Sequence, residues 1–254
     1  VYKRQVQYDE MATPYRHAAD RGGPVARIKH DLNRRTFQSA GHVVAWSRWV
    51  RDSLVEDYGV RTDRITVIPI GLDLSLWSAD PRPRKGPLRI LFVGGDLYRK
   101  GGQALLKAYG DLAPGFAELT LVTRSPDPGA PGVRVVPGMT PNTPELIDLY
   151  RSSDVLVLPS EAEAFGIAAV EGAAMGLPVI ASDVGGLGEI VVDGETGFLI
   201  EPGSVQQLGR RLRQLDDDRL RRRLGEQART RAIVEFDAQR NVARLVEILR
   251  AVGG

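Results

Sequence analysis

The amino-acid sequence predicts an α/β protein whose main domain is a doubly wound parallel sheet. From residue 88 onward, short apolar segments of strand type alternate with helical segments, a pattern typical of parallel sheets with crossover helices. Residues 154–183 show it most clearly, because they run through an apolar strand, a polar turn, a helix of small residues and another strand. Glycine-rich turns after other strands would lie at the carboxyl edge of the same sheet, where open α/β sheets bind ligands.

The first 80 residues are expected to hold two short strands, too few for a complete domain of the same kind. Ser47 is a suitable N-cap for a helix, and Gly59 is the residue type that commonly ends one. The expected helices cover residues 27–40 and 48–58, and the expected strands cover 43–46 and 65–69.

A linker is predicted between the two parts of the chain. Residues 78–87 contain three prolines and three basic residues without an apolar period, which is typical of a connecting segment. We place a domain boundary near residue 80 and expect a second domain over residues 81–225. A long helix is expected from about residue 226 to residue 252.

The second domain is expected to contain six strands. Thr143 and Pro144 are a clear helix start, since a capping residue precedes a proline at the first helical position. Gly176 and Pro178 end the helix that opens at residues 165–167. The expected strands are 88–93, 119–122, 133–136, 154–158, 179–181 and 196–200, and the other helices are 103–110, 143–151, 205–215 and 219–224.

Composition excludes several classes of protein. The 254 residues include no cysteine, so neither a disulfide framework nor a thiolate site is expected. The net charge of +2 gives no nucleic-acid signature, and no apolar run approaches the roughly 20 residues that span a bilayer. The chain begins at Val1 without a signal-peptide pattern, so we expect a fragment or a processed start and a cytoplasmic protein. His17, His30 and His42 lack metal-binding spacing.

Two glutamates lie on either side of a helix start at Gly166. Glu171 follows Glu163 by eight residues, which on a helix is a rise of about 12 Å. The carboxylates of glycosidase pairs lie roughly 5 to 9.5 Å apart, so this spacing does not predict acid–base chemistry between the two glutamates. Instead they fit the two ends of an extended ligand whose anion binds the helix N-terminus. The alternative is a buried strand–helix–strand unit with two solvated glutamates.

A glycine-rich turn over residues 94–102 carries Arg99 and Lys100. The turn matches neither G-x-G-x-x-G nor a Walker A sequence, so it does not predict a dinucleotide oxidoreductase or a P-loop protein. The two cations would suit a diphosphate at the sheet edge, and the alternative is a solvated turn with surface cations. A second glycine-rich loop, residues 183–189, is interpreted either as a ligand contact or as a tight connection.

Arginines are dense between residues 210 and 223, and three aspartates at 216–218 interrupt them. We interpret this segment as a solvated helical face whose charges pair with one another. The alternative is a surface for an anionic membrane or an acidic partner.

The motifs follow one another in the order of a known family. Residues 159–171, PSEAEAFGIAAVE, contain two glutamates in an E-x(7)-E pattern, and Arg99-Lys100-Gly101 forms a basic loop upstream. Residues 60–73 and 176–199 supply further motifs in the same order. Over about residues 40–225, the sequence resembles family 4 retaining glycosyltransferases, which have the GT-B fold of two Rossmann-like domains facing a cleft.

The resemblance implies a nucleotide-sugar site and an enzyme of the hexosyltransferase type. Glu163 would meet the transferred sugar, and Lys100, helped by Arg99, would neutralise the leaving diphosphate. Glu171 would hold the ribose, and the loop at Gly138 would meet the base. The implied catalytic residues are Glu163, Lys100 and Arg99, and the implied donor-binding residues are Gly94, Gly95, Gly138, Phe165, Gly166, Ile167 and Glu171. The reaction would retain the anomeric configuration and need neither a metal nor another cofactor.

By the same resemblance, residues 1–80 would be the end of an N-terminally truncated acceptor-side domain with the interdomain segment. Residues 226–254 would form a helix that crosses back to that domain. The acceptor would be a sugar, a lipid or a small molecule, as in polysaccharide or glycolipid biosynthesis. No nucleic acid is expected as a partner, and the protein could contact the inner face of a membrane peripherally.

Three departures from the family pattern matter. Gly94-Gly95 stands where the family often has Gly-Arg, so one phosphate cation is missing or is replaced by Arg99. Ile70 stands where asparagine is usual, and most of the first domain is absent. Two alternatives therefore stay open: a GT-B sugar-nucleotide epimerase, and a donor-binding fragment without turnover.

Overall fold

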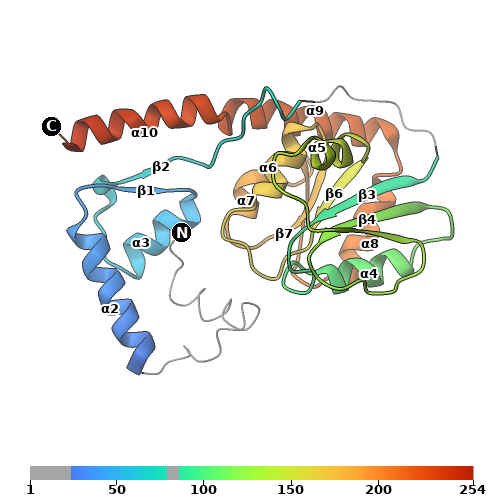
Figure 1. Cartoon of the computed structure of the whole chain (residues 1–254), viewed down its shortest axis with the longest axis horizontal. Coiled ribbons are helices and arrows are strands. Elements are labelled where there is room, and N and C mark those ends of the chain that lie inside the picture. The colour runs from blue at the N-terminus through green and yellow to red at the C-terminus, as the bar shows by residue number, and fades with distance from the viewer. Residues whose placement is uncertain (1–23, 79–85, 254) are drawn as a thin grey trace. The chain divides into compact units, whose positions relative to one another are not determined.

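The computed structural model describes residues 24–78 and 86–253, and the chain divides into two compact units (Figure 1). Among the described residues, the first unit holds 24–71 and 238–253, and the second holds 72–78 and 86–237. The division falls at residue 71, earlier than the expected boundary near residue 80. The reason is that the N–H group of Leu72 donates to the carbonyl of Phe236 at 2.7 Å, within the second unit. Most of the predicted linker, residues 79–85, lies outside the described residues.

The first unit combines helices with a two-stranded parallel sheet. Its elements are α2 (Pro24–Ser39), β1 (Val43–Ala45), α3 (Arg48–Glu56), η2 (Thr62–Arg64), β2 (Ile65–Val67) and α10 (Ala238–Gly253). Ser47 caps α3 as predicted, since its Oγ accepts a hydrogen bond from the N–H of Val50 at 3.1 Å. The α10 helix joins this unit through Asn241, whose Nδ2 donates to the carbonyl of Pro69 at 3.1 Å.

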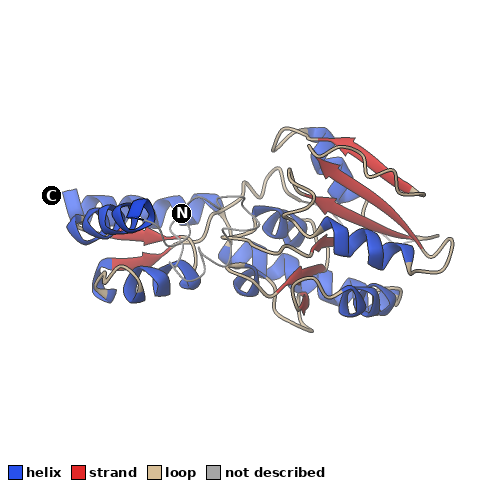
Figure 2. Cartoon of the chain, turned by 90° about the horizontal axis from the view of Figure 1, so that it is seen from below, coloured by secondary structure: helices blue, strands red, loops and turns tan. Residues whose placement is uncertain are grey.

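The second unit contains a six-stranded sheet in which all neighbouring strands are parallel, as the sequence predicts (Figure 2). The strands are β3 (Leu88–Val93), β4 (Ala117–Thr123), β5 (Val133–Pro137), β6 (Val155–Leu158), β7 (Val179–Ser182) and β8 (Gly197–Ile200). Their order is β5-β4-β3-β6-β7-β8. The chain thus runs outward from β3 to one edge, returns to β6 beside β3, and runs outward to the other edge. This is the doubly wound arrangement of a Rossmann-like domain.

Helices cover both faces of this sheet. They are α4 (Gly102–Gly110), α5 (Pro144–Arg151), α6 (Ile167–Ala174), α7 (Leu187–Ile190), α8 (Val205–Gln214) and α9 (Asp218–Glu235). Alternate residues of β6 face opposite layers, because Val155 and Val157 share a core with α4 and α8, whereas Leu156 lies against Gly172 of α6. The α4 helix packs with α8, and α6 packs with α9.

The C-terminal helices differ from the prediction. The sequence predicts helices over 219–224 and about 226–252, whereas the structure has α9 and α10, separated at Phe236 and Asp237. Phe236 is buried and its ring packs edge-on against Phe165 at a centroid distance of 6.2 Å, while Asp237 bridges to Leu72. These long-range contacts stop the helix at this point, and helical periodicity does not reveal them. Within the described residues, no helix combines the length and apolar character needed to cross a membrane.

Candidate functional site

The strand order of the sheet reverses between β3 and β6, so the loops after these two strands meet at one carboxyl edge. The N–H of Glu161 in the second loop donates to the carbonyl of Arg99 in the first loop at 3.3 Å. Gly101 has a φ of 73° and lies so close to Pro159 that a Cβ atom would overlap the proline carbonyl. The two loops are therefore packed backbone to backbone at the place where doubly wound sheets bind ligands.

Lys100 and Glu163 form an ion pair across these loops, although they lie 63 positions apart in the chain. Their side chains are only 16% and 11% exposed, so solvent screens the pair less than it screens a surface pair. The sequence predicts both residues at this edge but not their contact. The pair places one cation and one carboxylate side by side at the reversal point of the sheet.

The N-terminus of α6 lies close to this pair in the chain, since its N-cap Gly166 follows Glu163 by three residues. Gly166 has a φ of 101°, which side chains rarely allow, and its carbonyl accepts hydrogen bonds from the N–H groups of Ala169 and Val170. The preceding N–H groups of the first turn have no acceptor within the helix and carry the positive end of its dipole. Ile167 at this end is 46% exposed, so an anion can reach the helix start.

The glycine-rich loop after β7 supports the loop that carries Glu163. Gly185 has a φ of 56°, and a Cβ atom there would overlap the carbonyl oxygen of Glu163. A Cβ atom on Gly186 would lie 3.0 Å from the Cα of Phe165. Of the two interpretations of residues 183–189, the structure favours the tight connection. Phe165 is itself buried.

Glu171 is buried, as Glu163 is, and is held by a tyrosine. The residue is only 6% exposed, and the hydroxyl of Tyr150 donates to Glu171 Oε2 at 2.5 Å. Burial raises the pKa of the Glu171 carboxyl, and the hydrogen bond from Tyr150 opposes that rise in part. Burial, together with the nearby carboxylate, raises the pKa of Tyr150 well above its usual range. The tyrosine therefore stays a neutral donor that orients the glutamate.

The sequence does not single out Tyr150, because it lies among the apolar positions of α5 and has the pattern of a core residue. Its ring packs edge-on against Trp77 at a centroid distance of 5.2 Å. Trp77 is buried, and its Nε1 donates to Oδ1 of Asn142 at 2.9 Å. Asn142 has a positive φ of 62°, unusual for a residue other than glycine. This chain of contacts fixes the position of the tyrosine hydroxyl.

The remaining predicted residues lie in the loops after β3 and β5. A Cβ atom on Gly94 would lie 3.0 Å from Cγ of Lys100, so this glycine makes room for the stem of the lysine. Arg99 is 20% exposed, and its Nε lies 4.0 Å from the Asp96 carboxylate. The negative charge of Asp96 partly balances the positive charge of Arg99. Gly95 and Gly138 both lie against Arg124, a residue in none of the motifs of the sequence.

Replacing Glu171 by glutamine is expected to raise the melting temperature at neutral pH and to weaken nucleotide binding. Because the native carboxyl has a raised pKa, the native state binds its proton more tightly than the unfolded chain. This group therefore lowers the free energy of unfolding as pH rises from the ordinary carboxyl range through the raised pKa. Each kcal/mol regained would raise the melting temperature by about 2–4 °C.

Melting curves from acid to neutral pH check this prediction, with Glu226→Gln on the exposed side of α9 as the matched control. The gain of Glu171→Gln should vanish at the acid end, where the native carboxyl is already protonated. An equal gain at every pH would contradict the assignment to Glu171 titration.

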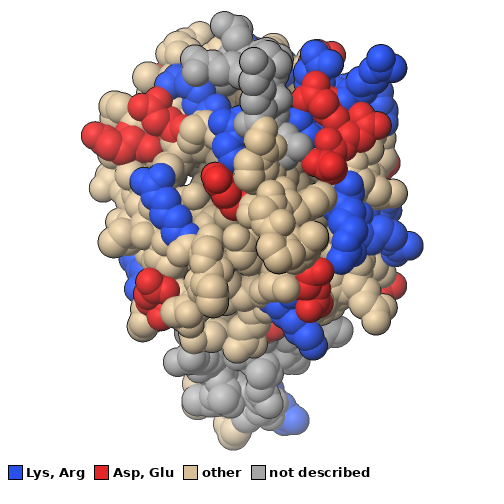
Figure 3. Space-filling view, turned by 90° about the vertical axis from the view of Figure 1, so that its right-hand side faces the viewer, with Lys and Arg blue, Asp and Glu red and all other residues tan. Residues whose placement is uncertain are grey.

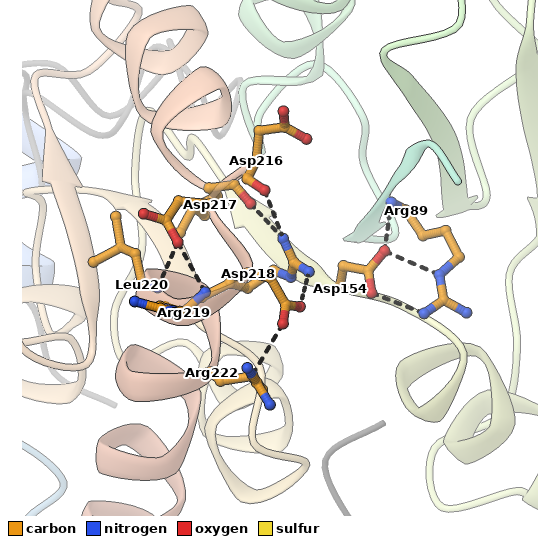
Figure 4. A network of polar contacts seen from close by, with 10 residues as sticks. Arg89, Asp154, Asp216, Asp217, Asp218, Arg219, Leu220 and Arg222 are labelled. Atoms are coloured by element: carbon orange, nitrogen blue, oxygen red, sulfur yellow. Dashed lines mark hydrogen bonds and ion pairs between the residues drawn. The ribbon is translucent and has the colours of Figure 1, made fainter. Parts of the chain in front are cut away.

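The arginine-rich segment pairs with its own surroundings (Figure 4). Arg221 is 5% exposed, and it donates to the carbonyl of Leu215 at 2.7 Å and to Asp218 at 2.6 Å. Arg222 pairs with the same aspartate at 3.1 Å. On the face drawn in Figure 3, Lys and Arg are interspersed with Asp and Glu. These contacts favour the interpretation as a self-paired face over a surface for an anionic partner.

The described histidines take part in hydrogen bonds within the first unit. Nε2 of His30 lies 3.2 Å from the carbonyl of Asp57, and Nε2 of His42 lies 2.9 Å from the hydroxyl of Thr66. The third, His17, lies outside the described residues. Across residues 24–78 and 86–253, no three His, Cys, Asp or Glu side chains are grouped so that they could hold a metal ion.

Two family models match this chain. Residues 133–231 match the model described as "Glycosyl transferases group 1", and residues 9–76 match the one described as "Glycosyltransferase Family 4". The chain belongs to the family 4 glycosyltransferases. Glu163 and Glu171 both lie within the first of these matches.

Curated relatives are longer than this chain. A glycogen synthase of Mycobacterium tuberculosis is 34% identical over 238 residues, which cover 88% of this chain and 57% of that protein. A D-inositol 3-phosphate glycosyltransferase of Paenarthrobacter aurescens is 34% identical over 257 residues, which cover 91% of this chain and 62% of that protein. The chain therefore spans about three fifths of the length of these relatives.

Solved structures show the same fold. A glycosyltransferase from Rickettsia africae superposes with a TM-score of 0.76 at 24% identity, covering 86% of this chain and 66% of that one. The Anabaena protein HepE, solved in complex with UDP-glucose, superposes with a TM-score of 0.76 at 20% identity, covering 87% and 67%. The chain has the GT-B type of fold, with one complete Rossmann-like domain formed by the second unit.

Proposed function

We propose that this chain contains the donor site of a retaining glycosyltransferase that moves a sugar from a nucleotide-diphosphate-sugar to an acceptor hydroxyl without a metal. The observation that carries the proposal is the Lys100–Glu163 pair at the reversal point of the sheet, next to the start of α6. A lysine and a helix N-terminus together offer positive charge and N–H donors, which suit a diphosphate.

Each residue of the site then has a separate task. The diphosphate draws the ammonium of Lys100 away from Glu163, and the first turn of α6 binds the phosphate oxygens. As the bond between the sugar and the diphosphate breaks, negative charge grows on the leaving oxygen, and Lys100 stabilises it there. The released carboxylate of Glu163 accepts hydrogen bonds from the sugar hydroxyls.

Glu171 suits the ribose end of the donor. Tyr150 occupies Oε2 of its carboxylate and thereby fixes the direction of Oε1, which can accept hydrogen bonds from the ribose hydroxyls. The task of Glu171 is therefore recognition rather than proton transfer. Retention of configuration is part of the proposal because the resemblance to family 4 implies it.

The acceptor is a hydroxyl of a sugar, a lipid or a small molecule. One curated relative is named for glycogen and another for D-inositol 3-phosphate, so the relatives do not favour one acceptor class. A cytoplasmic location and peripheral contact with a membrane stay predictions from the sequence.

A thermal-shift screen against UDP-, GDP-, ADP- and TDP-sugars, each with and without EDTA, tests the donor site. We expect sugars of one nucleotide to stabilise the chain by about 2.7 kcal/mol at a hundred times the dissociation constant. EDTA should leave that shift unchanged. No shift with any nucleotide sugar would overturn the donor site, and a shift that requires Mg²⁺ or Mn²⁺ would overturn metal independence.

The nuclear magnetic resonance spectrum of the transfer product of a full-length version tests retention. The product should keep the anomeric configuration of the donor sugar. Release of an epimerised sugar without any acceptor would instead support the sugar-nucleotide epimerase.

A further inference from the structure

Arg124 follows β4 directly, at the same carboxyl edge as Lys100. Its backbone is tied to the loop after β3, because its N–H donates to the carbonyl of Gly95 at 3.2 Å. The next residue is tied to the same loop, since the hydroxyl of Ser125 accepts a hydrogen bond from the N–H of Leu97 at 3.0 Å. The start of this side chain is therefore fixed relative to the loop that carries Lys100.

The side chain of Arg124 lies against two glycines from two other loops. A Cβ atom on Gly138, after β5, would overlap its Cγ, and a Cβ atom on Gly95 would lie 2.9 Å from its Nη2 and 3.1 Å from its Nε. Neither glycine has a positive φ, so the backbone does not require glycine at either place. The two glycines instead leave the room that the arginine stem and guanidinium occupy.

Lys100 and Arg124 flank one dipeptide. The stem of Lys100 lies against Gly94, and the guanidinium of Arg124 lies against Gly95. Consecutive Cα atoms are about 3.8 Å apart, so the two cationic side chains border the same short piece of backbone.

The charges of the three cations at this edge are balanced differently. Lys100 pairs with Glu163, and Arg99 lies near Asp96. Arg124 is exposed, and within residues 24–78 and 86–253 no carboxylate lies at ion-pair distance from its guanidinium. Its charge is thus available to a ligand.

We propose that Arg124 is the second diphosphate-binding cation of the donor site, where its guanidinium fork binds phosphate oxygens of a nucleoside diphosphate beside Lys100. The proposal rests on the proposed donor function. It also replaces the expectation that Arg99 makes up for the cation lacking at Gly94-Gly95, because the guanidinium that lies against Gly95 belongs to Arg124. A guanidinium fork matches two phosphate oxygens at once, which a single ammonium does not.

Calorimetric titration with UDP and with uridine tests the proposal. If the unmodified chain binds another base, the diphosphate and the nucleoside of that base are used instead. Arg124→Met should weaken the affinity for the diphosphate about tenfold, or about 1.4 kcal/mol, and leave the nucleoside affinity within about twofold. Arg134→Met removes an equal charge from an exposed position on β5 and should change neither affinity. If the unmodified chain binds no nucleoside diphosphate, the donor function itself fails, which is a different result.

A rescue variant separates ligand binding from a merely structural effect. In the Arg124→Met background, Gly95→Arg would place a guanidinium from the neighbouring loop in the vacated space. The diphosphate affinity should then rise about threefold or more above that of Arg124→Met alone. Arg124→Gln keeps a polar side chain that follows a similar path, and it replaces the methionine variant in the test if that variant does not fold. An unchanged diphosphate affinity would overturn the proposal, and so would an equal loss for the nucleoside.

Discussion

Replacing Lys100 by methionine is expected to weaken the affinity for a nucleoside diphosphate about tenfold or more, and replacing Glu163 by glutamine is expected to strengthen it. In the structure the Glu163 carboxylate pairs with the ammonium and adds a negative charge beside the anion site. A diphosphate must displace that carboxylate before it binds. Removing the cation and removing its competitor therefore change the affinity in opposite directions, even though either substitution breaks the same ion pair.

Calorimetric titration with the diphosphate and with the nucleoside alone measures both effects. Lys107→Met is the matched control, since this lysine lies on the exposed side of α4, the helix that follows the loop of Lys100. In a full-length version supplied with an acceptor, both site variants should lose sugar transfer by about two to three orders of magnitude. If both variants shifted diphosphate affinity in the same direction, the pair would be a structural contact rather than part of the anion site.

Removing one member of the pair also affects stability. Lys100→Met leaves a carboxylate that is 11% exposed without its cation, which is unfavourable, so the free energy of unfolding should fall. The double variant Lys100→Met with Glu163→Gln removes both charges and should recover most of that loss. Comparing diphosphate affinity in the single and double variants keeps the binding effect apart from the folding effect.

Much of the architecture is readable in the sequence, because apolar segments and turn residues carry it locally. Residues 155–158 are buried and apolar on both sides, and the structure places β6 there between two helical layers. The sequence predicts a helix start at Gly166, and Gly166 is the N-cap of α6 in the structure. Once the sheet is parallel, the topology alone brings Lys100 and Glu163 to one edge.

What the sequence does not carry are the contacts between loops that are distant along the chain. The Lys100–Glu163 pair and the Tyr150–Glu171 hydrogen bond each join two different loops or helices. Arg124 is a further example, because it looks like a surface residue after a strand until Gly95 and Gly138 are seen against it. Periodicity and capping report on neighbours within one helix or strand. They therefore do not predict contacts between side chains of different elements.

Replacing Gly101 by alanine is expected to lower the free energy of unfolding by about 2–5 kcal/mol. A left-handed backbone costs an alanine about 1–2 kcal/mol, and forcing a methyl group into a packed site typically costs a further 1–3 kcal/mol. At Gly101 both apply, because φ is 73° and the added Cβ would overlap the carbonyl oxygen of Pro159. The alanine must therefore push the loop of Lys100 away from the loop of Glu163.

Gly115→Ala is the control that isolates the close approach between the loops. Gly115 has a φ of 76°, nearly the same as Gly101, but nothing lies within 4 Å of a Cβ atom built on it. Its substitution should cost only the backbone part, about 1–2 kcal/mol by urea unfolding, and leave diphosphate affinity unchanged. Gly101→Ala should lose diphosphate affinity as well as stability, because Lys100 is the residue just before it and moves with the loop. Equal losses of stability in the two variants, with the affinity intact in both, would show that the contact between the loops does not hold the site together.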